Sequence, residues 1–295
     1  MDTRITFQSQ GDTLVGRLLL PPGFSADRRV PGVLVTGAWF TVKEQMPLRY
    51  AHEMAERGFA ALVFDFRGFG ESGGALRQRE TPADKITDIQ AAAAFLSQRP
   101  EVADGRIGAL GLCASAGYVT EAACNSPALR AVAVVAPWFQ DRAVVDAVYG
   151  GTAGVAALRQ VGEHARAVLA ASGQQPFIPA ASLSDERALM FGAQYYTEAH
   201  RGLIPAWRNE ADPGFWPDWL DFDGLTGAER LHRPFLTVQS EAAALPQAAR
   251  QFYARVSAAK AELWLDNVSQ FDFYDHDAPV SAACDAAAAH FRAYL

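Results

Sequence analysis

The sequence is poor in cysteine and has no long hydrophobic run. Its 295 residues include three cysteines, Cys113, Cys124 and Cys284, which lie far apart and form no CxxC pair. An odd number of separated cysteines argues against a disulfide framework or a zinc site, and it favours a reducing compartment such as the cytoplasm. No apolar run reaches the roughly 18 residues that span a bilayer, and residues 1–10 lack a signal-peptide core. We therefore expect a cytoplasmic protein without a membrane partner.

The sequence also lacks basic clusters and metal-ligand motifs. Lys and Arg total 26 against 33 Asp and Glu, so the formal net charge is −7 at pH 7. An acidic chain without basic blocks is poorly suited to phosphate backbones, so nucleic acid is not an expected partner. No residues stand at metal-ligand spacing, and we expect neither a metal nor another cofactor. Half of the residues are hydrophobic and 20% are charged, which is typical of a globular protein with one large core. The oligomeric state stays open and includes a homodimer.

Short apolar runs alternate with helical patterns over most of the chain. Residues 5–20 alternate in polarity around Gln10-Gly11-Asp12, which predicts an antiparallel hairpin. Uninterrupted apolar strands separated by helices predict an α/β fold, with a mostly parallel central sheet and helices on both faces. The predicted strands are 32–35, 60–64, 106–111, 131–135, 234–238 and 262–265, and the predicted helices are 48–57, 82–98, 118–124, 248–255 and 280–294.

This alternation breaks at about residue 138. The interval 138–222 holds four of the six tryptophans, and clustered aromatic residues outside a sheet often line a pocket. We expect a mostly helical cap at 138–222, inserted into a core formed by 1–137 and 223–295. The alternative is a structural layer without a part in binding. The aromatic candidates for the substrate pocket are Trp138, Tyr149, Tyr195, Trp207 and Trp216.

The segment 68–73, Gly-Phe-Gly-Glu-Ser-Gly, follows a predicted strand and matches the GxGxxG pattern of dinucleotide-binding proteins. In that fingerprint the glycines open directly into a helix whose N-terminus holds the pyrophosphate. Here a polar loop, residues 74–81, precedes the helix that begins at Pro82. We therefore interpret the glycines as turn residues.

The segment Gly111-Leu112-Cys113-Ala114-Ser115 lies where a predicted strand meets a helix. Small residues two positions either side of Cys113 fit a sharp strand–turn–helix elbow that presents a nucleophile. A second frame, centred on Ser115, also fits, but the strand length favours Cys113. A lone cysteine is more often a small buried hydrophobe, and the elbow reverses that interpretation. A helix N-terminus lowers the pKa of a thiol, so we expect a thiolate at Cys113.

Acyl transfer also needs two backbone N–H donors that stabilise an oxyanion. One is expected at Ala114, directly after the nucleophile, and the other at Ala38 or Trp39, in the loop after strand 32–35. Lys43 and Glu44 follow in the same loop. They could move protons in the substrate pocket, or they could form an ion pair that fixes the loop.

These motifs resemble the α/β-hydrolase superfamily, specifically its dienelactone-hydrolase-like bacterial branch with Cys at the elbow. The resemblance covers nearly the whole chain. It implies an α/β-hydrolase fold and the cleavage or transfer of esters, thioesters or lactones by a triad of Cys or Ser, an acid and His. The segments that carry it are 36–39, 43–45, 65–74, 111–118, 149–151, 201–209, 239–241 and 272–275.

The chain departs from this family at both partners of the nucleophile. Where the resemblance implies an Asp, the sequence has Ala243, and Glu241 is the only nearby carboxylate. Where it implies the His, the sequence has Gln270, which cannot accept a proton at neutral pH. His276, six residues further on, is the remaining candidate base.

The first candidate function is a hydrolase or acyltransferase that acts on a small hydrophobic ester, thioester or lactone through Cys113. Hydrolysis of an acyl-enzyme needs a base, typically worth about 10²–10⁴-fold. If His276 does not reach Cys113, hydrolysis should therefore be slow, and the acyl group should pass to a better nucleophile than water.

Two other functions remain open. One is a lyase or isomerase on the same fold, with Gln270 orienting the substrate and Lys43, Glu44 or Asp141 moving protons. The other is a catalytically silent protein whose cap binds an aromatic ligand.

Overall fold

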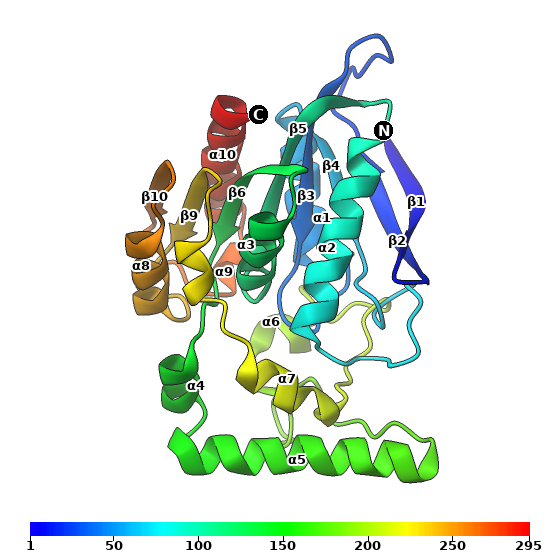
Figure 1. The fold of residues 1–295 in the computed structure, drawn as a ribbon, viewed down its shortest axis with the longest axis vertical. Coiled ribbons are helices and arrows are strands. Elements are labelled where there is room, and N and C mark those ends of the chain that lie inside the picture. Colours follow the sequence, from blue (N-terminus) through cyan, green and yellow to red (C-terminus); the bar gives the residue numbers. More distant parts are fainter.

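An eight-stranded sheet runs through the centre of the computed structural model, which describes residues 1–295 (Figure 1). β1 is antiparallel to β2 and β2 to β4, whereas all other neighbours in the sheet are parallel. This confirms the predicted mostly parallel sheet. In spatial order the strands are β1 (Asp2–Ser9), β2 (Asp12–Leu19), β4 (Ala60–Phe64), β3 (Val30–Thr36), β5 (Val102–Leu112), β6 (Leu129–Val135), β9 (Phe235–Gln239) and β10 (Lys260–Trp264).

The predicted hairpin is present at the N-terminus. Its two turn residues, Gln10 and Gly11, have φ angles of 50° and 87°. Positive φ at both central residues is the geometry of the two-residue turn whose twist matches that of paired strands. The turn residues and the alternating pattern beside them were therefore enough to predict this hairpin from the sequence.

Helices cover both faces of the sheet. α1 (Met46–Glu56) and α10 (Asp277–Tyr294) pack together on one face. α2 (Pro82–Ser97), α3 (Ser115–Asn125) and α8 (Pro246–Arg255) lie on the other, because right-handed crossovers that progress in the same direction across a sheet place their helices on the same side. All five residues of β4 are buried, as expected for a strand covered on both faces.

The chain between β6 and β9 forms a layer beyond the carboxyl ends of the strands (Figure 1). Long stretches of it are irregular, so it is less helical than expected. It contains the helices α4 (Arg142–Val148), α5 (Gly151–Ser172), α6 (Gln194–Thr197) and α7 (Trp216–Asp221), the short strands β7 (Ala181–Ser182) and β8 (Met190–Phe191), and the 3₁₀ turns η1 (Pro213–Phe215) and η2 (Thr226–Glu229).

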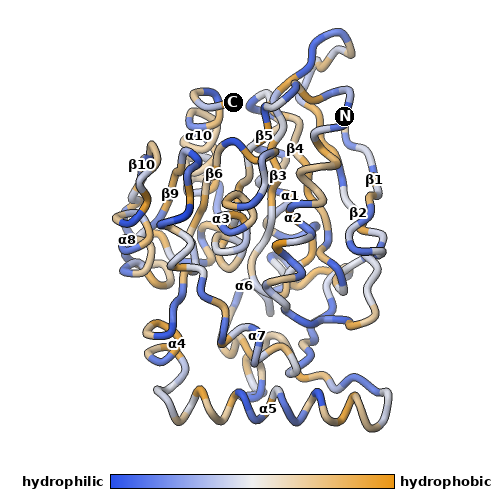
Figure 2. The backbone as a smooth tube through the Cα atoms, in the orientation of Figure 1, coloured by the Kyte–Doolittle hydropathy of each residue, from blue (hydrophilic) through white to orange (hydrophobic).

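α5 forms the outer edge of this layer, and hydrophilic and hydrophobic residues alternate along it (Figure 2). Only Val155, Gly162 and Ala165 are buried among its 22 residues. α5 therefore supports α7 from outside rather than lining the interior. None of the helices is both long and apolar enough to cross a membrane.

Candidate active site

Cys113 occupies a tight turn between β5 and α3. Its φ of 54° is in the left-handed region, which non-glycine residues rarely adopt. A Cβ on Gly111 would lie 2.7 Å from the Ser115 carbonyl oxygen, so glycine is what allows the helix to return this closely over the strand. Ser115 itself is fully buried and donates a hydrogen bond to the Gly37 carbonyl oxygen. The structure therefore centres the elbow on Cys113 and not on Ser115.

The Cys113 side chain lies in the wall of a cavity of about 330 Å³ between the sheet and the cap. Thirteen of its fourteen lining residues are hydrophobic, and none carries a charge. Such a cavity disfavours an ionised ligand, because a charge would lose its hydration without gaining a partner. The lining residues are Trp39, Cys113, Ala114, Trp138, Val148, Tyr149, Leu189, Met190, Tyr196, Trp219, Ala244, Gln270, Phe271 and Tyr274.

Two backbone N–H groups face the Cys113 sulfur, those of Ala114 and Trp39. Their positions, on the residue after Cys113 and in the loop after β3, are those expected for the donors of an oxyanion hole. Of the two candidates in that loop, the structure brings Trp39 to the sulfur. Ala38 instead uses its carbonyl oxygen to accept a hydrogen bond from Thr41.

The loop that carries the Trp39 amide is held from several directions. Glu80, fully buried before α2, accepts hydrogen bonds from the Phe40 amide, the Tyr118 hydroxyl and the Lys85 ammonium. From the cap, the Trp207 indole donates to the Phe40 carbonyl oxygen over 2.7 Å. These bonds keep the Trp39 N–H oriented without a bound ligand, which is the preorganisation that oxyanion stabilisation depends on.

Burial raises the pKa of the Cys113 thiol, and the contacts with Tyr274, Ala114, Trp39 and Gln270 offset this only in part. The expected thiolate is therefore not the resting state, because the apolar cavity outweighs the favourable helix end.

Gln270 stands beside the sulfur with its amide fully engaged. Its oxygen accepts from the Ala244 amide over 2.9 Å, and its nitrogen donates to the Ala136 carbonyl oxygen and to the Tyr274 hydroxyl over 3.0 and 3.1 Å. Since the Tyr274 oxygen accepts from Gln270, the Tyr274 proton is available to the nearby Cys113 sulfur. Tyr274 is a site residue that the sequence analysis missed.

The helical turn α9 (Asp272–Asp275) directs Tyr274 and the candidate base His276 to different sides. Gln270 and Tyr274 are four residues apart and share a face, whereas His276 is rotated by about 200° from Tyr274 along a helix. The His276 ring is 59% exposed and lies 3.1 Å from Asp272. The structure does not bring His276 to the cavity, and the geometry does not support it as the base.

Glu241 is also directed away from the site. Its side chain is 58% exposed and forms an ion pair with Arg250. It contacts neither Gln270 nor Cys113, so the structure offers no carboxylate in the role of triad acid. Asp141 caps the N-terminus of α4 through the Val144 amide and does not line the cavity.

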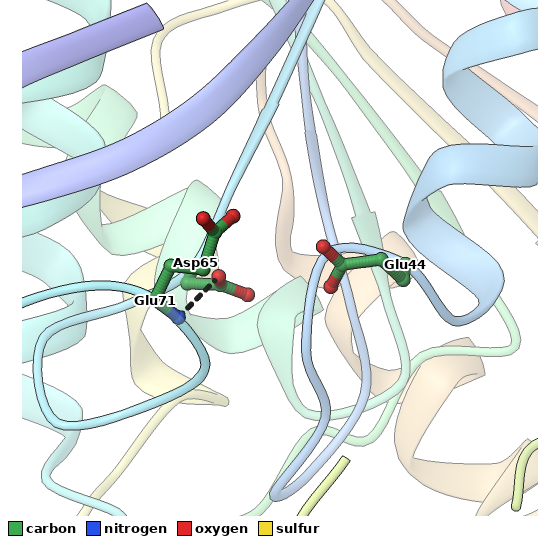
Figure 3. A group of neighbouring side chains, drawn as sticks. All are labelled: Glu44, Asp65 and Glu71. Carbon is green, nitrogen blue, oxygen red and sulfur yellow. Dashed lines mark hydrogen bonds between the residues drawn. The ribbon is translucent and has the colours of Figure 1, made fainter. Parts of the chain in front are cut away.

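Lys43 and Glu44 lie outside the cavity, in an ion cluster. The Lys43 ammonium is 2% exposed and lies 2.7 Å from carboxylate oxygens of Glu44, Asp65 and Glu71. Desolvation alone would lower its pKa, but the Asp65, Glu44 and Glu71 contacts raise it, and the group stays charged. Figure 3 shows the carboxylates converging from the loop before α1 and the loop after β4. The arrangement corresponds to the loop-fixing interpretation, and Lys43 neutralises a donor set that could otherwise hold a cation.

The glycines of residues 68–73 also shape this cluster. A Cβ on Gly70 would lie 2.2 Å from the Asp65 carboxylate, and Gly68 and Gly70 have φ angles of 80° and 45°. The loop reaches α2 only at Pro82, so these residues serve the turn and not a dinucleotide.

Of the aromatic residues expected in the pocket, Trp138 and Tyr149 line the cavity. The other three do not line the cavity but pack against residues that do. Trp216 packs edge-on against Tyr149, Trp207 packs on Tyr196, and Tyr195 packs edge-on against Tyr196. The lining aromatic residues that were not predicted are Tyr196, Trp219, Phe271 and Tyr274.

Over residues 10–270 the sequence matches the protein family described as X-Pro dipeptidyl-peptidase (S15 family). The chain belongs to the S15 family. It is 27% identical to the uncharacterized protein YcjY of Escherichia coli over the full length of both, and 30% identical to the uncharacterized protein PA2218 of Pseudomonas aeruginosa, over 92% of this chain and 76% of that one. The crystal structure of PA2218 covers the whole chain with a TM-score of 0.89.

Relatives whose names state an activity match this S15 member over shorter stretches. A polyketide transferase of Penicillium crustosum is 31% identical over 45% of this chain and 44% of its own. A thiohydrolase of Aspergillus aculeatus is 32% identical over 43% of this chain and 38% of its own. These relatives and the family place the chain among enzymes of hydrolase type with an α/β-hydrolase fold.

The likeness to dienelactone hydrolase is one of fold. The enzyme from Anabaena variabilis superposes with a TM-score of 0.60 over the whole chain and 98% of its own, at 13% identity. The expected α/β-hydrolase fold is therefore confirmed.

Proposed function

We propose that this protein transfers a neutral, hydrophobic acyl group from an ester or thioester through a covalent thioester on Cys113. The observation that carries the proposal is the Cys113 sulfur at a strained elbow, in the wall of an uncharged cavity and facing the N–H groups of Trp39 and Ala114. The names of two fungal relatives, a polyketide transferase and a thiohydrolase, agree with acyl chemistry at a sulfur centre.

In the first step a bond forms between the Cys113 sulfur and the substrate carbonyl carbon, and the carbonyl oxygen becomes an oxyanion between the two N–H groups. The bond to the leaving group then breaks. The thiol proton leaves with the departing thiol or alcohol, and the Tyr274 hydroxyl, which contacts the sulfur, can relay it by receiving one proton while giving another. This step requires no charged base, because the Tyr274 hydroxyl gains one proton as it gives up another and stays neutral.

The second step decides between hydrolysis and transfer. Water is a weak nucleophile and needs a base, and neither Gln270 nor Tyr274 can supply one at neutral pH. Burial and the nearby Cys113 hold the pKa of Tyr274 well above its ordinary value. An acceptor thiol or amine attacks without that help, and its proton returns to the Cys113 sulfur. The protein should therefore act as an acyltransferase with slow hydrolysis.

The site supports a lyase or isomerase less well, since Lys43, Glu44 and Asp141 do not line the cavity. A binding protein without turnover would form no acyl adduct at Cys113.

The test is mass spectrometry of the intact protein mixed with the octanoyl thioester of N-acetylcysteamine. We expect an adduct of one octanoyl group that persists in buffer and disappears when a second thiol is added, with the transfer product formed. Cys113→Ala should abolish the adduct, and His276→Ala, which changes an exposed ring, should retain it. Absence of any adduct in the folded protein would favour binding only, and rapid hydrolysis without an adduct would show that water is activated.

A further inference from the structure

Tyr149 follows the last residue of α4 and lines the cavity. The phenol oxygen accepts a hydrogen bond from the Trp219 indole N–H over 2.7 Å. Its ring packs edge-on against Trp216 at a centroid distance of 5.4 Å. Burial raises the pKa of Tyr149, and the nearby Cys113 raises it further, so the group is a neutral phenol close to the sulfur.

The hydrogen bond from Trp219 decides what Tyr149 can still do. An indole nitrogen only donates, so the phenol oxygen in this pair is the acceptor and its own proton must point elsewhere. No oxygen, nitrogen or sulfur atom of the protein accepts that proton. A ligand that places an oxygen atom beside Tyr149 can accept this proton.

Two other polar groups of the wall are already hydrogen-bonded within the protein. Trp138 directs its indole N–H to Gln140, away from Tyr149. The Tyr274 hydroxyl is committed to Gln270 and to the Cys113 side. The buried indole N–H of Trp39, which also lines the cavity, has no hydrogen-bond partner in the protein either. Tyr149 is therefore the hydroxyl group, beside this indole, that offers the cavity an unused donor.

We infer that Tyr149 determines substrate specificity by donating a hydrogen bond to an oxygen atom within the acyl chain. The substrate class is then a neutral acyl ester or thioester whose chain carries a carbonyl oxygen, rather than a plain saturated fatty acyl group. This inference rests on the proposed acyl transfer, and it adds a second recognition point to the thioester carbonyl held by Trp39 and Ala114.

Octanoyl and the 3-oxo-, 5-oxo- and 7-oxooctanoyl thioesters of N-acetylcysteamine provide the test, with kcat/KM measured for transfer to a thiol. For the isomer whose oxygen reaches Tyr149, Tyr149→Phe should lower kcat/KM about tenfold more than it lowers kcat/KM for the octanoyl thioester. Comparison of variant with wild type for each substrate removes the difference in intrinsic reactivity. The matched control is Tyr196→Phe, which removes another cavity hydroxyl and should change all four rates by the same factor.

Equal losses for all substrates in Tyr149→Phe, or no loss for any oxo isomer, would overturn the inference while leaving the proposed function intact. A second experiment tests the role of Tyr149 independently of acyl transfer. It measures by calorimetry the binding of the corresponding unreactive amides to the Cys113→Ala variant. If no substrate is turned over but an oxo amide binds about tenfold more weakly to Cys113→Ala/Tyr149→Phe, the proposed acyl transfer fails and the role of Tyr149 stands.

Discussion

A base introduced at position 270 should accelerate the second step of the proposed reaction, in which the acyl group leaves Cys113, and should make hydrolysis efficient. We expect Gln270→His alone to have a small effect. The Ala244 amide, which now donates to the Gln270 oxygen over 2.9 Å, would donate to a ring nitrogen and stabilise a neutral ring without orienting it as a base. A carboxylate that accepts the other ring proton is missing, because position 243 is alanine and Glu241 is paired with Arg250.

The double variant Ala243→Asp/Gln270→His supplies both groups. General-base catalysis typically contributes about 10²–10⁴-fold, and we expect the loss of the octanoyl group from Cys113 to accelerate by at least about 10². The change has a cost in stability. Gln270 makes three hydrogen bonds and an imidazole can make two, so one partner loses its bond, at about 1–3 kcal/mol. Ala243 is also 8% exposed, and its replacement buries a carboxylate.

The assay follows the octanoyl adduct by mass spectrometry after excess thioester is removed, so that only the second step is observed. Ala243→Asp alone is the control for nonspecific opening of the cavity. Wild-type protein that hydrolyses its adduct as fast as the double variant would refute the reasoning, because it would mean that water already has a base.

Three further outcomes follow from the same geometry. Because burial raises the pKa of Cys113 and only the thiolate is alkylated, the rate of iodoacetamide labelling should rise about tenfold per pH unit from pH 7 to 9; a plateau near neutral pH would contradict this. Tyr274→Phe removes a contact that lowers this pKa, so labelling at pH 8 should slow several-fold and octanoyl adduct formation should fall about tenfold. Lys43→Met leaves the buried Asp65 without its cation and should lower the free energy of unfolding in urea by about 3–5 kcal/mol, whereas Glu241→Gln, in an exposed pair, should change it by less than about 1 kcal/mol.

The parts of the fold that the sequence predicted are those that depend on neighbouring residues. The predicted strand 60–64 coincides with β4, because an uninterrupted apolar run bounded by Gly58 and Asp65 has few alternatives. α3 begins at Ser115, three residues earlier than predicted, because the elbow leads into the helix without an intervening loop. The position of Cys113 could be predicted for the same local reason.

Side chains that meet from distant segments were harder to predict. Gln270 was noted as a substitution, but its partner Tyr274 is defined by the direction of one helical turn. His276 was the candidate base because of its chemistry, and the turn rotates it towards solvent. Trp216 and Trp219 belong to the same short helix, and only packing against Tyr149 decides which of them reaches the cavity.

The burial of Lys43 would protect its amine from the activated acyl groups that the proposed function brings to the protein. Thioesters acylate accessible amines without a catalyst, so an acyl-transfer enzyme endangers its own lysines. This chain has three lysines among 26 basic residues. Lys43 and Lys85 are each 2% exposed and held by carboxylates, which leaves Lys260 as the exposed one. Guanidinium groups, which supply the rest of the positive charge, remain protonated and unreactive. The molecule thus carries its surface charge in a form that its proposed substrates do not consume.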